Sequence, residues 1–333
     1  MRILAYEFIT GGGLAGVTLP PSLAEEGGAM LAALVSDLSE IDGVTVVTTR
    51  DDRCPALMLP VDVVAPLSGE MPLAHFERAV AMADAVWPIA PESGGTLESL
   101  IRIALNKGKI ALCCRPEAVR IAASKRRTSD WLIRHGIPAV PTYDREDAMP
   151  PHPGAWVVKP DDGTGCADTL RVRDKAAAKA HVAAGRGFVA QPWIEGEAMS
   201  LSMLCADGEA RVLSCNRQQV VEREGMLALD RVMVNAAPLS PAMCDLACRV
   251  AKALPGLWGY VGVDLVDTPH GPVVIEINPR LTTSYCRLHA AIGENPAALV
   301  LGLLDRRRCF AHTQRTGATA DLAHAFEDIR NAA

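Results

Sequence analysis

The sequence predicts an α/β protein in which a doubly wound parallel sheet is followed by an α+β region built on antiparallel strands. The first part of this prediction rests on four apolar, strand-like runs that alternate with helical segments, a pattern typical of parallel sheets. The second part rests on two hairpin patterns, in which apolar runs flank turn residues such as Asp207 and Gly208. The strand-like runs are residues 2–9, 44–50, 84–90 and 109–114, and the hairpins are residues 200–221 and 259–280.

Composition limits the classes of protein to consider. The chain has 333 residues, of which 49% are hydrophobic and 22% charged, as in a globular protein with two or three domains. No apolar run reaches the ~18 residues that a membrane span needs. The first residues also lack the layout of a signal peptide. We therefore expect a cytoplasmic protein without a membrane partner.

Charge and metal-binding residue types exclude further classes. The formal net charge is −6 and the longest basic run is residues 306–308, so we expect no nucleic-acid partner. The 10 cysteines show no paired C-x-x-C spacing, and a domain of this size needs no disulfides, so they are expected to be reduced thiols. The 8 histidines are scattered and predict no histidine-based metal site.

The first strand-like run leads into residues 11–16, which match the pattern Gly-x-Gly-x-x-Gly. A dinucleotide site would need the last glycine to begin a helix whose N–H groups face the phosphates. Here Pro20 and Pro21 intervene, and we expect the helix to begin at Ser22, which forms a capping box with Glu25. Three interpretations stay open at this point: a dinucleotide site, a flexible connection, and a loop whose backbone lines a substrate cleft.

Proline residues and turn signals divide the rest of the chain. Pro150, Pro151 and Pro153 mark a boundary, beyond which short strands surround a helix-like stretch. The expected helices are residues 96–108, 124–136, 175–184 and 241–254, and the short strands are residues 156–159, 169–172 and 188–193. The expected domains are an N-terminal βα domain at residues 1–120, a small domain at 121–190, a C-terminal domain at 191–310 and a tail at 311–333.

The second hairpin brings two carboxylates together. Residues 269–271 are expected to form a three-residue loop with its glycine in the left-handed conformation, which would pair Thr268 with Pro272. Counting back along both strands from that pair places Asp264 opposite Glu276. The two carboxylates would then point to the same face of the sheet.

This face of the hairpin predicts a magnesium site. Asn278 lies two residues beyond Glu276 and points the same way, because side chains alternate along a strand. Like charges directly opposed across two strands are destabilising, so a cation between them is the natural remedy. Oxygen ligands without histidine or cysteine suit Mg²⁺. The alternative is a pair of solvated acids on an exposed sheet face.

Lys159 ends an apolar strand and is followed at once by a loop that contains Gly163, Thr164 and Gly165. A lysine at a strand end can place a point charge on phosphates, while the backbone N–H groups of a glycine loop contact them. No Gly-x-x-x-x-Gly-Lys-Ser/Thr motif occurs in the sequence, so a P-loop is not the source of nucleotide binding.

The order of these parts resembles the ATP-grasp carboxylate-amine ligases over roughly residues 84–285. The resemblance implies the ATP-grasp architecture: an N-terminal doubly wound parallel-sheet domain, a small domain that covers ATP, and a C-terminal antiparallel-sheet domain. It also implies ATP and Mg²⁺ as cofactors, with Mn²⁺ as a substitute metal. The nucleotide-binding residues that it implies are Lys125, Lys159, Gly163, Thr164, Gly165, Gln191, Trp193, Ile194 and, at the ribose hydroxyls, Glu197.

The same resemblance assigns the second hairpin, because GVDLV and VVIEINPR match the magnesium pattern of the family. Arg280 would face the transferring phosphate or the tetrahedral oxyanion, and with Lys159 it would act in catalysis. The glycine loop departs from the family at residues 166–168, which leaves its phosphate contacts open. Each match also has an alternative: Trp193 as a core residue, Lys125 as a solvated residue, Arg280 as a salt-bridge partner. The implied metal ligands are Asp264, Glu276 and Asn278.

The activity implied by the resemblance is ATP-dependent joining of a carboxylate to an amine through an acyl phosphate. Residues 1–13 further resemble the start of the tyramine-glutamate ligase branch, which serves methanofuran-type coenzyme synthesis. This branch implies glutamate and tyramine, or tyrosine, as small-molecule substrates. Two alternatives stay open: a carboxylating or phosphoryl-transferring member of the family, and a non-catalytic nucleotide-binding protein. The oligomeric state is also open, with a homodimer as one option.

The resemblance places the N-terminal glycine loop beside the pocket for the non-nucleotide substrates. Topology agrees, since ligands of open α/β sheets bind beyond the carboxyl ends of the strands. Glu7 and Glu92 are candidates to orient the amine and take up its proton, the alternative being structural carboxylates that cap local N–H groups. The other substrate candidates are Gly12, Gly13, Arg217, Ser284 and Tyr285, for which surface charge and sheet-end packing are the alternatives.

Overall fold

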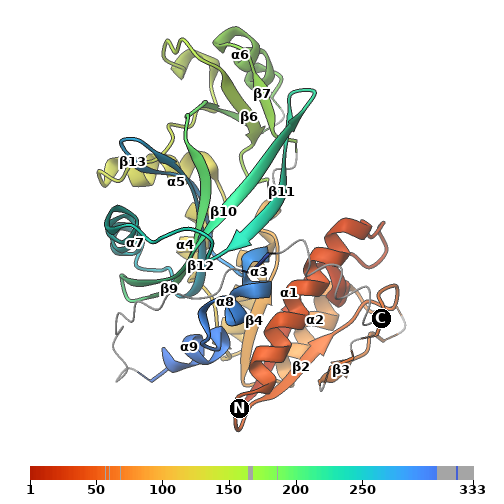
Figure 1. The fold of residues 1–333 in the computed structure, drawn as a ribbon. Coiled ribbons are helices and arrows are strands. Elements are labelled where there is room, and N and C mark those ends of the chain that lie inside the picture. Colours follow the sequence, from red (N-terminus) through yellow and green to blue (C-terminus); the bar gives the residue numbers. More distant parts are fainter. Residues whose placement is uncertain are drawn as a thin grey trace.

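The computed structural model describes residues 1–305 except positions 57, 60, 68, 164–167 and 186, together with the backbone of residues 320–321. Figure 1 shows a βα unit around the N-terminus, a small group of strands with helix α6 at the top, and long strands β10 and β11 between them. None of the helices in this part of the chain combines the length with the apolar character that a membrane crossing requires.

The first sheet has the strand order β3-β2-β1-β4-β5, and its neighbouring strands pair in parallel, as predicted. The short strand β3 and helix α4 were not among the predicted elements, and α2 was expected only as a helical segment between the second and third strand-like runs. The strands are β1 (Arg2–Glu7), β2 (Thr45–Thr49), β3 (Asp62–Val64), β4 (Ala85–Ile89) and β5 (Ile110–Ala111). The helices of this unit are α1 (Pro21–Ser39), α2 (Pro72–Ala81), α3 (Thr96–Asn106) and α4 (Pro116–Ala122).

Helices cover both faces of this sheet, which makes it doubly wound. Along β1, Leu4 and Tyr6 belong to a core cluster that contains Phe76 of α2, whereas the alternate residues Ile3 and Ala5 pack in a second cluster with α1. This division follows from the alternation of side chains along a strand. Both faces are apolar, as expected for a parallel sheet buried between helices.

Helix α1 begins at Pro21 with Pro20 at its N-cap, and no side chain caps it. The predicted start at Ser22 with a capping box to Glu25 was therefore wrong. Proline is well suited to the first helical position, since its fixed φ angle is already helical and its missing N–H would have no partner there. Two consecutive prolines were the stronger start signal than the capping pattern.

The second sheet has the strand order β13-β12-β9-β10-β11-β7-β6-β8, and neighbours along this path pair antiparallel, as predicted. The sheet joins the small upper unit of Figure 1 to the C-terminal strands through the pairing of β7 with β11. The strands are β6 (Trp156–Pro160), β7 (Leu170–Val172), β8 (Phe188–Pro192), β9 (Glu197–Ala206), β10 (Glu209–Arg223), β11 (Met226–Val234), β12 (Gly259–Thr268) and β13 (Gly271–Asn278).

Shorter elements complete the described chain. The predicted tail, residues 311–333, lies outside the described residues except for strand β14 (Ala320–Asp321), which pairs with β11. The cysteines among the described residues are free thiols. The remaining helices are α5 (Lys125–Arg134), α6 (Lys175–Ala183), α7 (Pro241–Ala253), α8 (Leu288–Ile292) and α9 (Pro296–Gly302).

The hairpin β12–β13 places Asp264 opposite Glu276, although its turn differs from the predicted one. Thr268 pairs with Gly271 rather than Pro272, so the loop is one residue shorter than expected. The register then shifts between Asp264 and Leu265, where an extra residue on β13 forms a bulge. The shorter turn and the bulge offset each other, which is why the two carboxylates still face each other.

Candidate active site

A cavity of about 240 Å³ lies between the small upper unit and the C-terminal strands. Its walls come from strands β6 and β8–β13, helix α5, the segment that follows β13, and a single turn of α1. The sequence-predicted residues that line it are Lys125, Lys159, Gly163, Gln191, Trp193, Ile194, Asp264, Glu276, Asn278, Arg280 and Ser284. Residues separated by more than 150 positions thus meet in one cavity.

Two buried lysines carry positive charge that acts on the carboxylate of Glu276. Lys125 and Lys159 are each 7% exposed, although a lysine is rarely buried without a partner. Lys125 Nζ lies 3.3 Å from Glu276 Oε2 and also donates a hydrogen bond to the backbone oxygen of Gly163. Both positive charges act on Glu276 and, against the effect of burial, lower its pKa. The cavity therefore concentrates positive charge beside the glycine loop.

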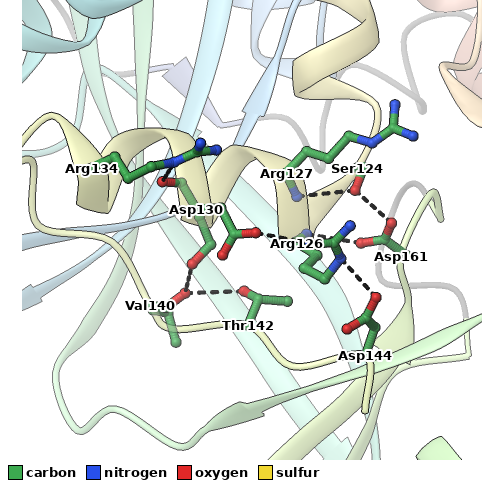
Figure 2. A network of polar contacts seen from close by, with 10 residues as sticks. Ser124, Arg126, Arg127, Asp130, Arg134, Val140, Thr142, Asp144 and Asp161 are labelled. Atoms are coloured by element: carbon green, nitrogen blue, oxygen red, sulfur yellow. Dashed lines mark hydrogen bonds and ion pairs between the residues drawn. The ribbon is translucent and has the colours of Figure 1, made fainter. Parts of the chain in front are cut away.

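Figure 2 shows how the chain fixes the start of helix α5, where Lys125 lies. Ser124 caps the helix by accepting a hydrogen bond from the backbone N–H of Arg127, at 3.1 Å. Asp161 accepts hydrogen bonds from the Ser124 hydroxyl at 2.6 Å and from the backbone N–H of Arg126 at 2.8 Å. Because Asp161 follows β6 directly, this network sets the position of Lys125 relative to Lys159.

The opposite wall is formed by the end of β8 and the residues after it. Gln191 donates a hydrogen bond from Nε2 to the hydroxyl of Thr142 at 2.8 Å, which leaves its amide oxygen available to a ligand. The guanidinium of Arg171 lies 4.3 Å from the centre of the Trp193 ring. Trp193 also donates from its ring nitrogen to Glu195 at 2.7 Å, so it lies at the cavity wall and not in the core.

Asp264, Glu276 and Asn278 form the floor of the cavity. Asp264 accepts hydrogen bonds from Gln218 Nε2 at 2.9 Å and from Asn278 Nδ2 at 3.0 Å. Burial, together with the neighbouring charge of Glu276, raises the pKa of Asp264 to about 7. The two carboxylates are half-buried within a cavity, so the alternative of solvated acids on an exposed face does not describe them.

This donor set fits a divalent cation that also binds substrate. The described residues contain no group of three or more histidine, cysteine, aspartate or glutamate side chains arranged to hold a metal alone. Mg²⁺ is usually held by one or two carboxylates together with substrate phosphates, so two carboxylates and one amide suffice. Burial, and after it repulsion between these carboxylates, raises the pKa of Asp264, and a cation would relieve the repulsion.

Arg280 is held at the end of the cavity by an ion pair with Glu92, in which Nε and Oε1 are 3.0 Å apart. The two side chains are only 12% and 5% exposed. Arg280 also donates a hydrogen bond to the backbone oxygen of Leu281 at 3.0 Å. Glu92 follows β4 at the carboxyl end of a strand of the first sheet. Its carboxylate contacts Arg280 and is not among the residues that line the cavity.

The structure places Glu7 outside the cavity lining. Its carboxylate accepts hydrogen bonds from the backbone N–H groups of Ile9 at 3.0 Å and Thr10 at 2.6 Å, and from the Thr10 hydroxyl at 2.7 Å. The side chain is 2% exposed. These contacts correspond to the structural alternative, a carboxylate that caps local N–H groups. Gly12 and Gly13 also lie outside the cavity lining, since the loop folds into a tight turn (Ile9–Gly13) tied to Glu7.

Three further candidates are placed elsewhere. Glu197 and Arg217 form an ion pair at 2.6 Å, with side chains 45% and 42% exposed, and neither lines the cavity. Tyr285 is 1% exposed and packs in the core cluster that contains α1. Surface charge and sheet-end packing were the alternatives considered for Arg217 and Tyr285, and they describe the surroundings of these two residues. Thr164 and Gly165 lie outside the described residues.

Sequence reasoning missed two features of the site. Glu26 of α1 lines the cavity, and so do Thr282 and Thr283, which precede Ser284. The signal for Glu26 was the pair Gly27-Gly28 inside a helix, because glycine in a helix interior often marks close packing. A Cβ atom at position 27 would lie 2.5 Å from the Glu7 carboxyl carbon.

Comparison with known proteins identifies the family. Residues 122–284 match the ATP-grasp domain, and residues 44–119 match the pre ATP-grasp 3 domain. An ATP-grasp superfamily protein from Archaeoglobus fulgidus has a similar structure, with a TM-score of 0.69 and 26% identity over 91% of this chain and 88% of that one. The chain therefore carries an ATP-grasp domain preceded by a pre ATP-grasp domain, in agreement with the ATP-grasp resemblance noted in its sequence.

Two relatives carry the same name within this family. A tyramine–L-glutamate ligase from Methanocaldococcus jannaschii is 30% identical over 196 residues, which cover 59% of this chain and 55% of that protein. A tyramine–L-glutamate ligase from Methanocaldococcus fervens is 27% identical over 280 residues, covering 79% and 82%. The matched segment thus spans a little over half of the first relative and most of the second.

Proposed function

We propose that this protein is an ATP-dependent ligase that joins a carboxylate to an amine and releases ADP and phosphate. The observation that carries the proposal is the convergence of Lys125, Lys159 and Arg280 on one carboxylate, Glu276, within a single cavity. A carboxylate on which three positive charges act, with Asp264 opposite it, suits a site that receives a metal and several phosphate charges.

The proposed reaction has two steps. An oxygen of the substrate carboxylate attacks the γ-phosphorus of ATP, the bond to the β-phosphate oxygen breaks, and ADP leaves. The amine nitrogen of the second substrate then attacks the acyl carbon, phosphate leaves, and the amine loses a proton to give the amide. Neither step needs a nucleophilic side chain, so catalysis rests on position and charge.

The residues divide this work by position. Lys125 and Lys159 would hold the phosphates, and Arg280, fixed by Glu92, would neutralise charge on the transferring phosphate or on the tetrahedral oxyanion. Gln191, Trp193 and Ile194 would hold the base of ATP; the support is their place along one wall of the cavity. The proposed metal ligands are Asp264, Glu276 and Asn278, and Mg²⁺ bound there would neutralise phosphate charge.

Glutamate and tyramine, or tyrosine, are the proposed substrates. Support comes from the names of the two relatives and from the resemblance of residues 1–13 to that branch of the family. The γ-carboxylate of glutamate would be activated, and the aromatic amine would attack it. Thr282 and Ser284 line the end of the cavity near Arg280 and offer hydroxyl groups to a polar substrate.

The test measures ADP and product in two mixtures. The protein is incubated with Mg-ATP, glutamate and hydroxylamine, and then with tyramine or tyrosine in place of hydroxylamine. We expect a glutamyl hydroxamate in the first mixture and a γ-glutamyl amide in the second. ADP formation that requires a different carboxylate would retain the ligase and discard glutamate. ADP formation that requires bicarbonate would favour a carboxylase, and tight ATP binding without turnover would contradict catalysis.

A further inference from the structure

Glu26 reaches the cavity from a part of the chain that otherwise stays outside it. Of the described residues that line the cavity, Glu26 comes from helix α1, and all the others follow Ser124 in the sequence. Among the described residues, the unit formed by the first sheet and its helices therefore contributes one acidic side chain to the cavity lining. Glu26 lines the same cavity as Arg280, Thr282 and Ser284, and the charge of Arg280 acts on it.

The local packing fixes Glu26 in this position. The neighbouring Gly27 lies so close to Glu7 that a Cβ atom would come within 2.5 Å of its carboxyl carbon. Glu7 in turn is held by the backbone N–H groups of Ile9 and Thr10. Helix α1 is thus pinned to the end of β1 beside Glu26, and the Glu26 side chain projects from a rigid element.

The Glu26 side chain is partly buried. Its carboxylate nevertheless has no hydrogen-bond or ion-pair partner among the described residues. Arg280, whose charge acts on Glu26, already forms an ion pair with Glu92 at 3.0 Å. Burial raises the pKa of Glu26 despite the opposing charge of Arg280. A partly buried carboxylate without a partner is unfavourable until a ligand supplies a donor.

We propose that Glu26 binds the ammonium group of an amine-bearing substrate, with the hydroxyls of Thr282 and Ser284 beside it. This assignment rests on the proposed function, in which the donor amino acid and the acceptor amine both enter as ammonium ions. An ammonium group supplies positive charge and several N–H donors, which match a carboxylate and two hydroxyl oxygens. A second carboxylate at this point would be repelled by Glu26.

Other ligands fit Glu26 less well. The phosphate groups of ATP belong with Lys125 and Lys159, and a metal belongs with Asp264 and Glu276, which share a face of the hairpin. A neutral alcohol would leave the charge of Glu26 uncompensated. An ammonium ion is therefore the ligand that fits Glu26 best, because it supplies both the positive charge and the N–H donors that the carboxylate lacks.

The experiment compares binding of ammonium compounds with binding of their deaminated analogues. Calorimetry with Mg²⁺ and a non-hydrolysable ATP analogue present measures glutamate against glutarate, and tyramine against 4-ethylphenol. In the parent protein, the ammonium compound should bind more tightly than its analogue. Glu26→Gln should weaken binding of the ammonium compound by about tenfold and leave the analogue unchanged, as expected for loss of one charged hydrogen bond. Glu26→Asp should retain part of the preference.

The control is Glu25→Gln, which changes an exposed acid on the same helix that does not line the cavity. It should bind all four compounds as the parent does. A loss confined to glutamate identifies the donor's ammonium group as the ligand, and a loss confined to tyramine identifies the acceptor's. If Glu26→Gln keeps the full preference for both ammonium compounds, the assignment is overturned while the proposed function stands. A parent protein that binds none of the four compounds would overturn both.

Discussion

The hairpin β12–β13 and the glycine-rich connection between β1 and α1 both place carboxylates where a functional site is expected, and they use them differently. In the hairpin, Asp264 and Glu276 oppose each other across two strands and face a cavity lined with lysines. In the connection, Glu7 turns back onto the N–H groups that follow it and is buried. The difference lies in whether the local backbone already satisfies the carboxylate.

This comparison explains why a carboxylate in a hairpin predicts a ligand site more reliably than a carboxylate beside a glycine-rich loop. Paired strands satisfy their own backbone groups, so the side chains of a hairpin stay available to a ligand. A tight turn leaves N–H groups without backbone partners, and a nearby carboxylate can accept hydrogen bonds from them. A glycine-rich loop after a strand is therefore ambiguous until its own N–H groups are accounted for.

The largest expected effect separates the two regions by activity. Glu276→Ala should lower turnover by about 100- to 1000-fold, because it removes a proposed metal ligand and the carboxylate that the lysines face. Circular dichroism and thermal unfolding should show a folded protein. Turnover near the parent rate in saturating ATP and Mg²⁺ would remove Glu276 from the metal site.

Glu7→Ala should act on stability instead. It leaves the N–H groups of Ile9 and Thr10 without their acceptor inside the protein, so the free energy of unfolding should fall by about 2–3 kcal/mol. Denaturant unfolding of the variant and the parent measures this difference. A variant that unfolds like the parent but loses turnover would return Glu7 to the group of substrate-binding residues.

The Glu7 carboxyl should also contribute to the pH dependence of stability. Burial raises its pKa in the folded protein above the ordinary value of 4.5, so the folded state holds its proton to higher pH than the unfolded state does. The stability that this proton contributes is present below the unfolded pKa and is lost as the pH rises through the folded pKa. The difference in unfolding free energy between the parent and Glu7→Gln should therefore shrink as the pH rises above about 4.5. A constant difference across that range would contradict the raised pKa.

Lys159→Ala should weaken ATP binding by about tenfold, because it deletes one charge that faces phosphate. The measurement is calorimetric titration with Mg-ATP, in parallel with Lys175→Ala on α6, a lysine outside the cavity lining. Only the first variant should lose affinity. Equal affinities for both variants and the parent would place Lys159 outside the nucleotide site.

The smallest effect concerns the start of helix α5. Ser124→Ala removes the N-cap and one contact with Asp161, and should lower the unfolding free energy by about 1 kcal/mol. Because Lys125 follows directly, ATP affinity should also fall slightly. The same titration and denaturant experiments measure both quantities, and a loss of affinity larger than that of Lys159→Ala would show that the cap matters more than a phosphate-facing charge.

The sequence was sufficient for the parts of the site that depend on local periodicity. The pairing of Asp264 with Glu276 was predicted correctly because two differences cancel: the predicted loop was one residue too long, and a bulge compensated for it. The two sheets and their pairing directions were likewise predictable, because helices alternate with strands in one half and turns separate strands in the other.

The sequence was insufficient where the outcome depends on contacts between distant segments. Glu26 lines the cavity on a helix that packs against the end of β1; the pair Gly27-Gly28 indicates close packing, but it does not say which distant segment the helix approaches. Glu92 was singled out as a substrate contact, whereas its carboxylate holds Arg280 from the other sheet. Tyr285 follows Ser284 directly but turns into the core, since neighbouring residues of a short helical turn face different sides.

The central claim, that a substrate carboxylate attacks the γ-phosphate of ATP in this cavity, can be tested by isotope transfer. The protein is supplied with Mg-ATP, tyramine and glutamate whose γ-carboxylate carries ¹⁸O, and the released phosphate is examined by mass spectrometry. An acyl phosphate requires one ¹⁸O atom to pass from the carboxylate into each phosphate released with the amide. Formation of the amide and ADP with phosphate free of ¹⁸O would contradict the mechanism.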